Sequence, residues 1–394
     1  MPMRSAAVVF FLVLFLGMTL PTAQEPAPGK EGITTAQVKA AIDKLGVLEF
    51  PVRMQAARTV RRAGPAVAVP LLSEAAASHK DGYVRFRALV LLSGFNDPST
   101  REVMTRMLPD PNDRLRTVAY TYFGHHPDPL ALPRLLDALS KEDSEFVRPA
   151  LTRAIAAYGS EPKVRELMAG LVMRGQDFFR SAAIEAIGDH KGTYAFASLT
   201  DVAKLNGPLQ DDAVLALGKL GDKRALETFA GLQRSASREM QPAVATAICL
   251  IGVNCASHQG YLTETIRFAI GTPGFQELLR GSANGLAVLA VAGNEEAART
   301  LIAVGTPSHD PARAAIALAL GTVALRNTPL LLRVLEKEKD LDGALELLRE
   351  AFDMLEEDFE EERFFVSVRK SYWQAAAASP TRKVTDALIQ KLEF

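Results

Sequence analysis

Aliphatic and small residues recur at helical spacing along most of this chain. In residues 179–229, an apolar residue followed by Arg or Gln opens two successive units, at Phe179 and at Leu209. Each opening leads into a stripe of Ala, Ile, Val and Leu that ends near a glycine, Gly188 or Gly218. A stripe with this spacing is typical of a helix that turns one side toward a core. The pattern therefore predicts a chain made of repeated helical units.

The second position of this unit, which we call the anchor position, recurs at nearly constant intervals. It is occupied by Arg53, Arg85, Arg116, Arg148, Arg180, Gln210, Gln241, Arg280 and Arg313. The successive separations are 32, 31, 32, 32, 30, 31, 39 and 33 residues. A period of this size is typical of stacked two-helix units, each too small to bury its apolar face alone. In the unit that begins at Val84, for example, we expect helices over residues 84–95 and 99–108 around a turn.

These units resemble the short HEAT-like repeats of the HEAT-repeat superfamily that were first noted in phycobilisome lyases. The resemblance covers roughly residues 50–330 and rests on the apolar-Arg-x-x-Ala opening and on an acidic residue after the first helix. It implies an all-α, right-handed α-solenoid, or superhelix, of HEAT-like helix-turn-helix repeats. It also implies a ladder in which Arg and Asp side chains pair between neighbouring repeats. The residues given this role are Arg85, Asp97, Arg116, Asp128, Arg148 and Arg180. Gln210 and Gln241 replace arginine in two units, so we expect the ladder to be interrupted there.

The resemblance also implies which surface binds. In related solenoids the second helices line the concave face, so their polar side chains become the candidate binding face. They are Arg101, Arg106, Arg134, Asp137, Lys163, Arg165, Asp201, Lys204 and Glu227. The alternative is that these side chains are simply solvated, because no stripe of one charge sign stands out among them.

Residues 1–23 are predicted to be a secretory signal peptide. Arg4 is their only charged residue, an apolar run covers residues 5–20, and a cleavage site lies near Ala23. The run is shorter than the roughly 20 residues of a membrane span. We therefore expect an extracytoplasmic protein, periplasmic or secreted, with no membrane insertion after cleavage. An uncleaved N-terminal anchor is the alternative.

The remaining boundaries follow from changes in pattern and composition. We predict a flexible lead over residues 24–33, N-terminal capping helices and a first repeat over 34–83, the HEAT-like repeat array over 84–330, and an acidic helix with a C-terminal cap over 331–394. Residues 335–363 hold 13 acidic and 4 basic side chains. Their acidic face is expected to be either solvated or a docking face for a basic partner or divalent cations.

The two cysteines, Cys249 and Cys255, lie where the repeat spacing stretches to 39 residues. Gly252 between them would let the chain fold back, and an oxidising compartment would permit a disulfide. Two separate thiols, with Cys249 packed as a small apolar residue, are the alternative. Two cysteines without His or Cys partners at ligand spacing do not indicate a metal site.

No motif points to catalysis. The sequence contains no phosphate-binding glycine loop, no nucleophile elbow and no zinc-binding His-Glu-x-x-His, so we assign no catalytic, cofactor-binding or metal-binding residue. A formal net charge of −1 argues against nucleic acid as a partner. The sequence thus favours a non-enzymatic scaffold or adaptor outside the cytoplasm that binds a protein of unknown identity through its concave face. Two alternatives stay open: a chromophore-lyase-like enzyme or ligand-transfer protein, and a membrane-anchored envelope adaptor. The sequence does not indicate an oligomeric state.

Overall fold

The computed structural model describes residues 32–355 and 357–394. The predicted signal peptide, residues 1–23, lies outside the described residues, as does the predicted lead, residues 24–33, up to residue 31. Within the described part, the chain forms 22 α-helices and two short 3-10 helices, and no strand. The all-α solenoid expected from the repeat pattern is confirmed.

The helices fall into four groups, of which the second and third alternate along the chain. The first is α1 (Thr35–Asp43), η1 (Lys44–Gly46), α2 (Phe50–Arg62) and α3 (Pro65–Ser78). The second, which we call the inner helices, is α4 (Gly82–Gly94), α6 (Asp113–His125), α8 (Arg148–Ala156), α10 (Asp177–Asp189), α12 (Gln210–Leu220), α14 (Gln241–Leu250), α16 (Gln276–Val291) and α18 (Ala312–Arg326). The third, the outer helices, is α5 (Thr100–Met107), α7 (Leu132–Leu139), α9 (Pro162–Met173), α11 (Phe196–Lys204) with η2 (Thr193–Ala195) before it, α13 (Ala225–Ser235), α15 (Cys255–Ile270) and α17 (Glu295–Gly305). The last is α19 (Thr328–Leu335), α20 (Leu341–Met354), α21 (Asp358–Gln374) and α22 (Pro380–Lys391).

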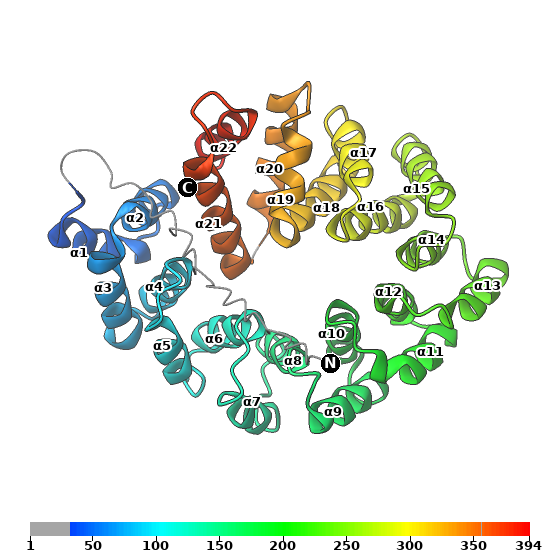
Figure 1. The fold of residues 1–394 in the computed structure, drawn as a ribbon, viewed down its shortest axis with the longest axis horizontal. Coiled ribbons are helices and arrows are strands. Elements are labelled where there is room, and N and C mark those ends of the chain that lie inside the picture. The colour runs from blue at the N-terminus through cyan, green and yellow to red at the C-terminus, as the bar shows by residue number, and fades with distance from the viewer. Residues whose placement is uncertain (1–31, 356) are drawn as a thin grey trace, which may run out of the picture.

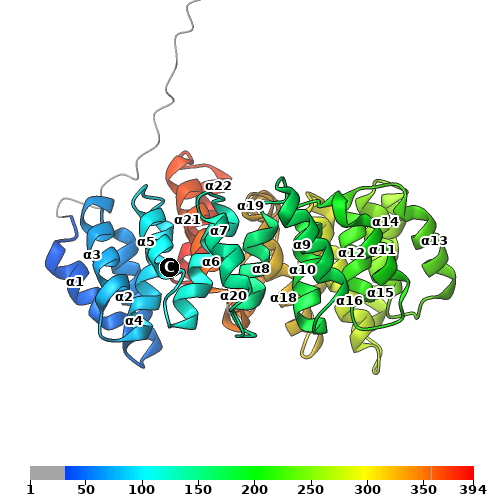
Figure 2. The same ribbon diagram turned by 90° about the horizontal axis from the view of Figure 1, so that it is seen from below.

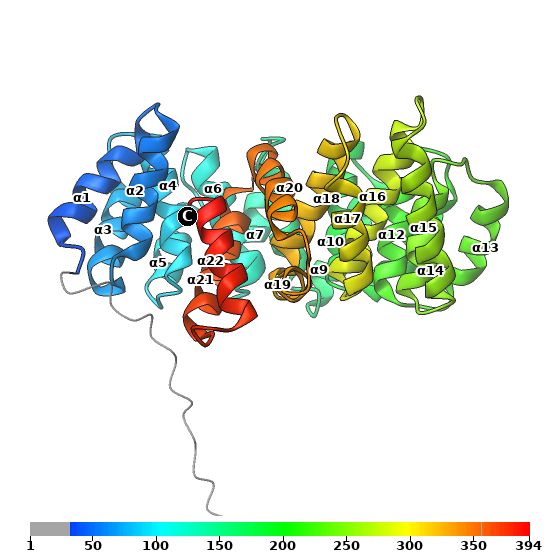
Figure 3. The ribbon, with the colours of Figure 1, turned by 90° about the horizontal axis from the view of Figure 1, so that it is seen from above.

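The array curves into a ring. Figure 1 looks down its axis and shows the inner helices facing the centre and the outer helices on the periphery. In the two side views, Figures 2 and 3, the helices stand next to one another in a band that is about one helix tall. Each repeat therefore contributes one helix to the inner wall and one to the outer wall.

Local sequence signals explain where the helices begin. The side chain of Asp81 accepts a hydrogen bond from the backbone N–H of Tyr83 at the start of α4, and Asn112 does the same for Arg114 at the start of α6. Such caps satisfy N–H groups that have no partner within the helix. Prolines stand in the first turn of α7, α8, α9 and α14, where the missing N–H costs nothing.

Small residues let the inner helices approach closely. Ala88, Ala119 and Ala213, on three different inner helices, are completely buried. A Cβ on Gly188 would lie 2.9 Å from the Cα of Ala216 on the next inner helix. Because such a contact is tighter than side chains tolerate, only glycine fits there. The small residues therefore set the tight spacing of the inner helices.

The ring closes through the C-terminal helices. Helix α21 packs against α4, so the last part of the chain lies beside the first repeats (Figure 1). The buried apolar side chains form two cores. The first covers residues 38–251 together with Phe359 of α21, and the second covers residues 245–394. Closure brings together elements about 300 residues apart, which the repeat pattern does not predict.

Candidate functional site

The ring encloses a central cavity of about 2070 Å³. Its lining comes from every even-numbered helix between α2 and α22, from α21 and from a few loop residues. Among the described residues, none on the outer helices α5 to α17 contributes to it. The inner helices therefore form the concave surface of this solenoid.

Charged side chains on the cavity wall mostly pair with each other between neighbouring helices. Arg153 on α8 pairs with Glu185 on α10 at 2.9 Å, and Lys219 on α12 pairs with Asp189 on α10 at 2.6 Å. Both pairs are partly exposed, so each stabilises the fold only weakly. The wall is polar, with cations and anions interspersed.

Aromatic side chains line the cavity near the start of the inner helices. The Arg114 guanidinium lies 5.4 Å from the ring centre of Tyr83 and 5.5 Å from that of Phe86. Phe50 and Phe146 also line the cavity and expose 59% and 79% of their surface. The exposed Phe50 ring lies 5.7 Å from the Arg53 guanidinium, and an exposed aromatic side chain beside an arginine is typical of protein-binding surfaces.

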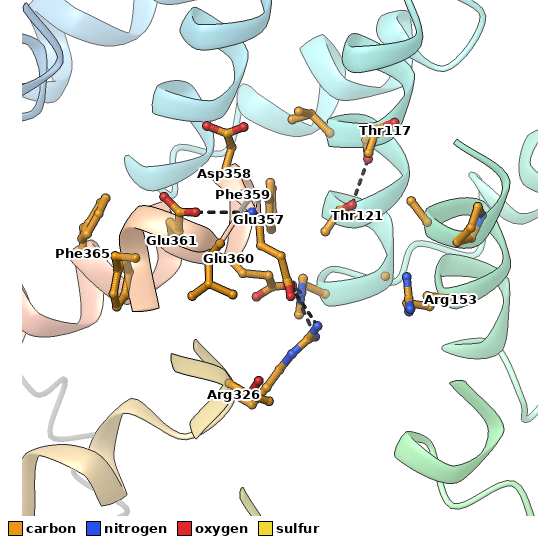
Figure 4. A pocket seen from close by; sticks show the side chains of 18 of the residues that line it. Thr117, Thr121, Arg153, Arg326, Glu357, Asp358, Phe359, Glu360, Glu361 and Phe365 are labelled. Atoms are coloured by element: carbon orange, nitrogen blue, oxygen red, sulfur yellow. Dashed lines mark hydrogen bonds and ion pairs between the residues drawn. The ribbon is translucent and has the colours of Figure 1, made fainter. Parts of the chain in front are cut away.

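The acidic start of α21 forms one side of what we call the closure joint. Its carboxylates Asp358, Glu360 and Glu362 each meet one basic side chain of the first repeats: Arg87 on α4, His125 on α6 and Arg61 on α2. Figure 4 shows Asp358, Phe359, Glu360 and Glu361 where α21 borders the cavity.

The innermost pair of the joint is fully buried. Glu362 accepts hydrogen bonds from Nε of Arg61 at 2.9 Å and from Nη2 at 2.7 Å. The two side chains expose only 3% and 2% of their surface. The Arg61 guanidinium also lies 4.9 Å from the ring centre of Phe365 on α21. This bidentate geometry fixes the register of α21 on α2.

The next carboxylate, Glu360, is held ionised. Burial raises the pKa of its carboxyl, but the hydrogen bond and charge of His125, together with two arginines, outweigh burial and lower the pKa to about 2. Nε2 of His125 lies 2.5 Å from the carboxylate. Arg363 and Arg326 lie 2.6 Å and 3.8 Å from it, and Figure 4 shows Arg326 reaching toward α21. Glu360 therefore stays negative at any physiological pH.

These contacts concern only the end of the acidic run, because acidic side chains earlier in it, such as Asp342 and Asp353, are exposed. Three of its carboxylates, at positions 358, 360 and 362, pair with the chain's own basic side chains; Glu360 and Glu362 are buried, whereas Asp358 is partly exposed. Neighbouring Glu361 lines the cavity, and burial together with the charge of Asp358 raises its pKa to about 7.

A comparison with protein families matches the first part of this array. The model for HEAT repeats matches residues 41–122 and again residues 108–188. These stretches run from the end of α1 into α10 and contain the same alternation of inner and outer helices that continues to α18. Residues 41–188 of this chain are therefore HEAT repeats.

Several solved structures resemble this HEAT-repeat protein. YibA from Escherichia coli is 19% identical over 56% of this chain and 82% of its own, with a TM-score of 0.41. The CpcE–CpcF complex of phycocyanin lyase from Nostoc sp. PCC7120 is 17% identical over 66% and 97%, with a TM-score of 0.41. Kap95p with RanGDP is 13% identical over 91% and 58%, with a TM-score of 0.42. A search of curated proteins returned no significant match.

The arginine ladder of the HEAT repeats has other acidic partners than we expected. Arg85 pairs with Asp110 at 2.5 Å, and Arg116 pairs with Glu142 at 2.8 Å. Both acids lie in the connection that precedes the next inner helix. That connection is where the arginine of one repeat reaches the next repeat.

The two aspartates proposed as rungs shape turns instead. Asp97 accepts a hydrogen bond from the backbone N–H of Ser99, and Asp128 from that of Leu130. Asp128 also lies 3.7 Å from Arg101, a longer contact between neighbouring repeats. Their assignment as partners of the ladder arginines was therefore wrong, because they follow the inner helix while the arginines stand at its beginning.

What the anchor residues share is a hydrogen bond to the backbone. All of them except Arg280 donate to a carbonyl at the end of the preceding helix or in the turn after it. The acceptors are Val47 and Leu48 for Arg53, Ala76 for Arg85, Asp110 and Pro111 for Arg116, Glu142 for Arg148, Val172 for Arg180, Ala203 for Gln210, Leu232 and Ala236 for Gln241, and Gly305 and Thr306 for Arg313. The two glutamines therefore interrupt the charge of the ladder but not its hydrogen bonds. Arg280 departs from the pattern and pairs with Glu277 on its own helix.

The candidate binding face does not lie on the concave surface, contrary to our prediction. Its nine residues, Arg101, Arg106, Arg134, Asp137, Lys163, Arg165, Asp201, Lys204 and Glu227, lie on the outer helices α5, α7, α9, α11 and α13. None of them lines the cavity. The physical reason is packing: alanine and glycine let the first helices of the repeats approach most closely, so that layer takes the smaller radius.

The structure joins Cys249, at the end of α14, to Cys255, at the start of α15, in a disulfide. Among the residues that the structure describes, no group of three or more His, Cys, Asp and Glu side chains is arranged to hold a metal ion. No single described helix is long and apolar enough to cross a membrane, although the pair α18 and α19, bent by 116°, passes the same test of length and composition.

Sequence patterns did not identify the basic half of the closure joint. Arg61, Arg87 and His125 lie on three different helices, and their carboxylate partners lie more than 230 residues away. The acidic run was the one signal available in the sequence. So many neighbouring carboxylates favour pairing with basic side chains, but only the curvature of the ring shows which basic side chains they meet.

Proposed function

We propose that this HEAT-repeat protein is a non-enzymatic scaffold that works outside the cytoplasm and holds a segment of a protein partner in its central cavity. The observation that carries the proposal is the cavity itself, lined all round by the inner helices. Its volume of about 2070 Å³ exceeds the roughly 300–1,000 Å³ of small-molecule sites. The exposed rings of Phe50 and Phe146 at its edge suit the apolar anchors of a polypeptide.

Photo-crosslinking tests which surface binds. A photoreactive phenylalanine analogue would replace Phe146, which lines the cavity, in the protein as its own cells produce it. The matched control is Phe268 on outer helix α15, which is 51% exposed. We expect one reproducible protein to be crosslinked from position 146 and not from position 268. Crosslinks from position 268 alone would move the binding face to the outside of the ring.

The location outside the cytoplasm rests on the signal-like segment at residues 1–23. Cell fractionation followed by intact-mass measurement tests it. A chain that begins near Gln24 in the envelope or secreted fraction supports export with cleavage. An intact N-terminus in the membrane fraction would instead support the membrane-anchored adaptor, and a cytoplasmic chain would overturn both.

A further inference from the structure

The closure joint differs in chemistry from the other contacts between repeats. Elsewhere neighbouring inner helices meet through small apolar residues, as Gly218 does with Ala247. Across the joint, Phe359 is the only described residue beyond position 251 that belongs to the first apolar core. The polar contacts of the joint include the three ion pairs of Asp358, Glu360 and Glu362 and a hydrogen bond of 2.7 Å from Arg369 to the backbone carbonyl of Arg61. Charged groups therefore make up a larger part of this joint than of the contact between Gly218 and Ala247.

A joint of this kind is easier to open than an apolar one. Ion pairs gain attraction when they form, but they lose hydration, and the loss is largest for a pair as deeply buried as Arg61 with Glu362. When the ring opens, water solvates both charges again and recovers that loss. An apolar contact recovers nothing on opening.

The basic side of the joint is a shaped surface rather than a single contact. Arg61, Arg87 and His125 come from three helices that line the cavity, α2, α4 and α6. Together they receive three carboxylates from the first turns of one helix, with spacing i, i+2 and i+4. We call these three side chains the basic receptor surface.

We propose that the basic receptor surface is a binding site for an acidic amphipathic helix of the partner protein, and that α21 occupies this site in the free molecule. The inference rests on the proposed function, since it describes how the partner reaches the cavity. The partner helix carries carboxylates at the spacing of Asp358, Glu360 and Glu362 and an apolar side chain in the place of Phe359. Binding displaces α21, and the ring opens between α4 and α21.

The test uses a synthetic peptide of residues 357–374 as the partner mimic, with the full mature chain as receptor. The control peptide carries glutamine at positions 358, 360 and 362. Receptors are the native chain and the variant Glu362→Gln, in which the internal competitor is weakened. We expect the native peptide to bind the variant about tenfold more tightly than the native chain, because more of the variant has a free site. The control peptide should bind at least about tenfold more weakly than the native peptide. Added salt should weaken the binding of the native peptide.

Hydrogen exchange on ¹⁵N-labelled chain shows whether the peptide takes the place of α21, because the label separates the two identical sequences by mass. Amide exchange in α21 should speed up when unlabelled peptide is added. If Glu362→Gln fails to fold by circular dichroism, Asp358→Asn replaces it, since Asp358 is 37% exposed. Equal affinity of the native peptide for both receptors, equally tight binding of the control peptide, or unchanged exchange in α21 would overturn the inference. Crosslinking from position 146 would then still stand, so the two proposals fail separately.

Discussion

Every anchor side chain except Arg280 donates a hydrogen bond to a backbone carbonyl, and this gives a single residue a role that its charge does not reveal. The last carbonyls of a helix lack partners within the helix, and an unsatisfied buried carbonyl is costly. Arginine and glutamine both present N–H donors on a side chain long enough to reach back to the preceding helix. Gln210 and Gln241 therefore keep the contact that matters for stacking, although they lose the charge.

Because of this role, alanine substitutions at two anchor positions should lower the free energy of unfolding by different amounts. Gln210→Ala should lower the free energy of unfolding by about 1 kcal/mol, because the carbonyl of Ala203 loses its donor. Arg280→Ala is the matched control, since Arg280 is 65% exposed and pairs only on the surface with Glu277; it should change stability by no more than about 0.5 kcal/mol. Urea unfolding of both variants measures the difference. Equal losses would mean that the anchor hydrogen bond contributes nothing.

Glu361 predicts how stability depends on pH. Its pKa is about 7 in the folded chain, compared with an ordinary value of 4.5. Between these values the folded state binds more protons than the unfolded state, so this group lowers stability as pH rises through that window. Glu361→Gln removes the titration. Relative to the native chain, the variant should gain on the order of 2 kcal/mol between about pH 5 and pH 8.

Denaturant midpoints at the two pH values measure this gain. Glu360 does not interfere, because its pKa of about 2 places its own loss of stability at much lower pH. If the native chain and the variant show the same pH dependence, Glu361 is ionised in the folded state at neutral pH.

At the scale of the helices, close approach within the inner wall depends on glycine. A Cβ on Gly218 would stand 2.6 Å from the Cα of Ala247, which is backbone and cannot move aside. Gly218→Ala should therefore lower the free energy of unfolding by about 2 kcal/mol or more. Gly231→Ala on outer helix α13 is the control, because no atom lies within 4 Å of the added carbon.

The control should be neutral or stabilising by about 0.5–1 kcal/mol, since alanine is the better helix former. Chemical unfolding of the two variants decides between them. If both alanines stabilise the chain, the inner helices are spaced more loosely than the structure indicates.

The arrangement of the helices could be predicted from the sequence only in part. The repeat period and the alternation of two helices per unit follow from local pattern, because each helix stripe reflects burial by its neighbours in the stack. Which helix faces the concave side does not follow from the stripe, since both helices bury one face. The clue was the small residues of the first helices, such as Ala88 and Gly188, because the layer with the closer spacing takes the smaller radius.

At the scale of the whole molecule, closure could not be predicted from local pattern at all. Whether the two ends of a solenoid meet depends on a small rotation per repeat, summed over the array. The acidic run before position 363 looked like a solvated face, because nothing nearby in the sequence balances its charge. Its partners Arg61 and Arg87 lie on α2 and α4, which only the accumulated curvature brings within reach.

If ion pairs hold the ring closed, charge reversal at one pair should open it and double reversal should close it again. Arg87→Glu places two like charges together at Asp358, and Asp358→Arg does the same at Arg87; either repulsion costs several kcal/mol across the joint. Each single variant should therefore show a larger radius of gyration in small-angle X-ray scattering, and the double variant should return to the native value. Arg153→Glu is the control, because its pair with Glu185 joins neighbouring inner helices that also share an apolar core. Single variants that keep the native radius would show that Phe359 and the packing around it hold the ring closed without the charges.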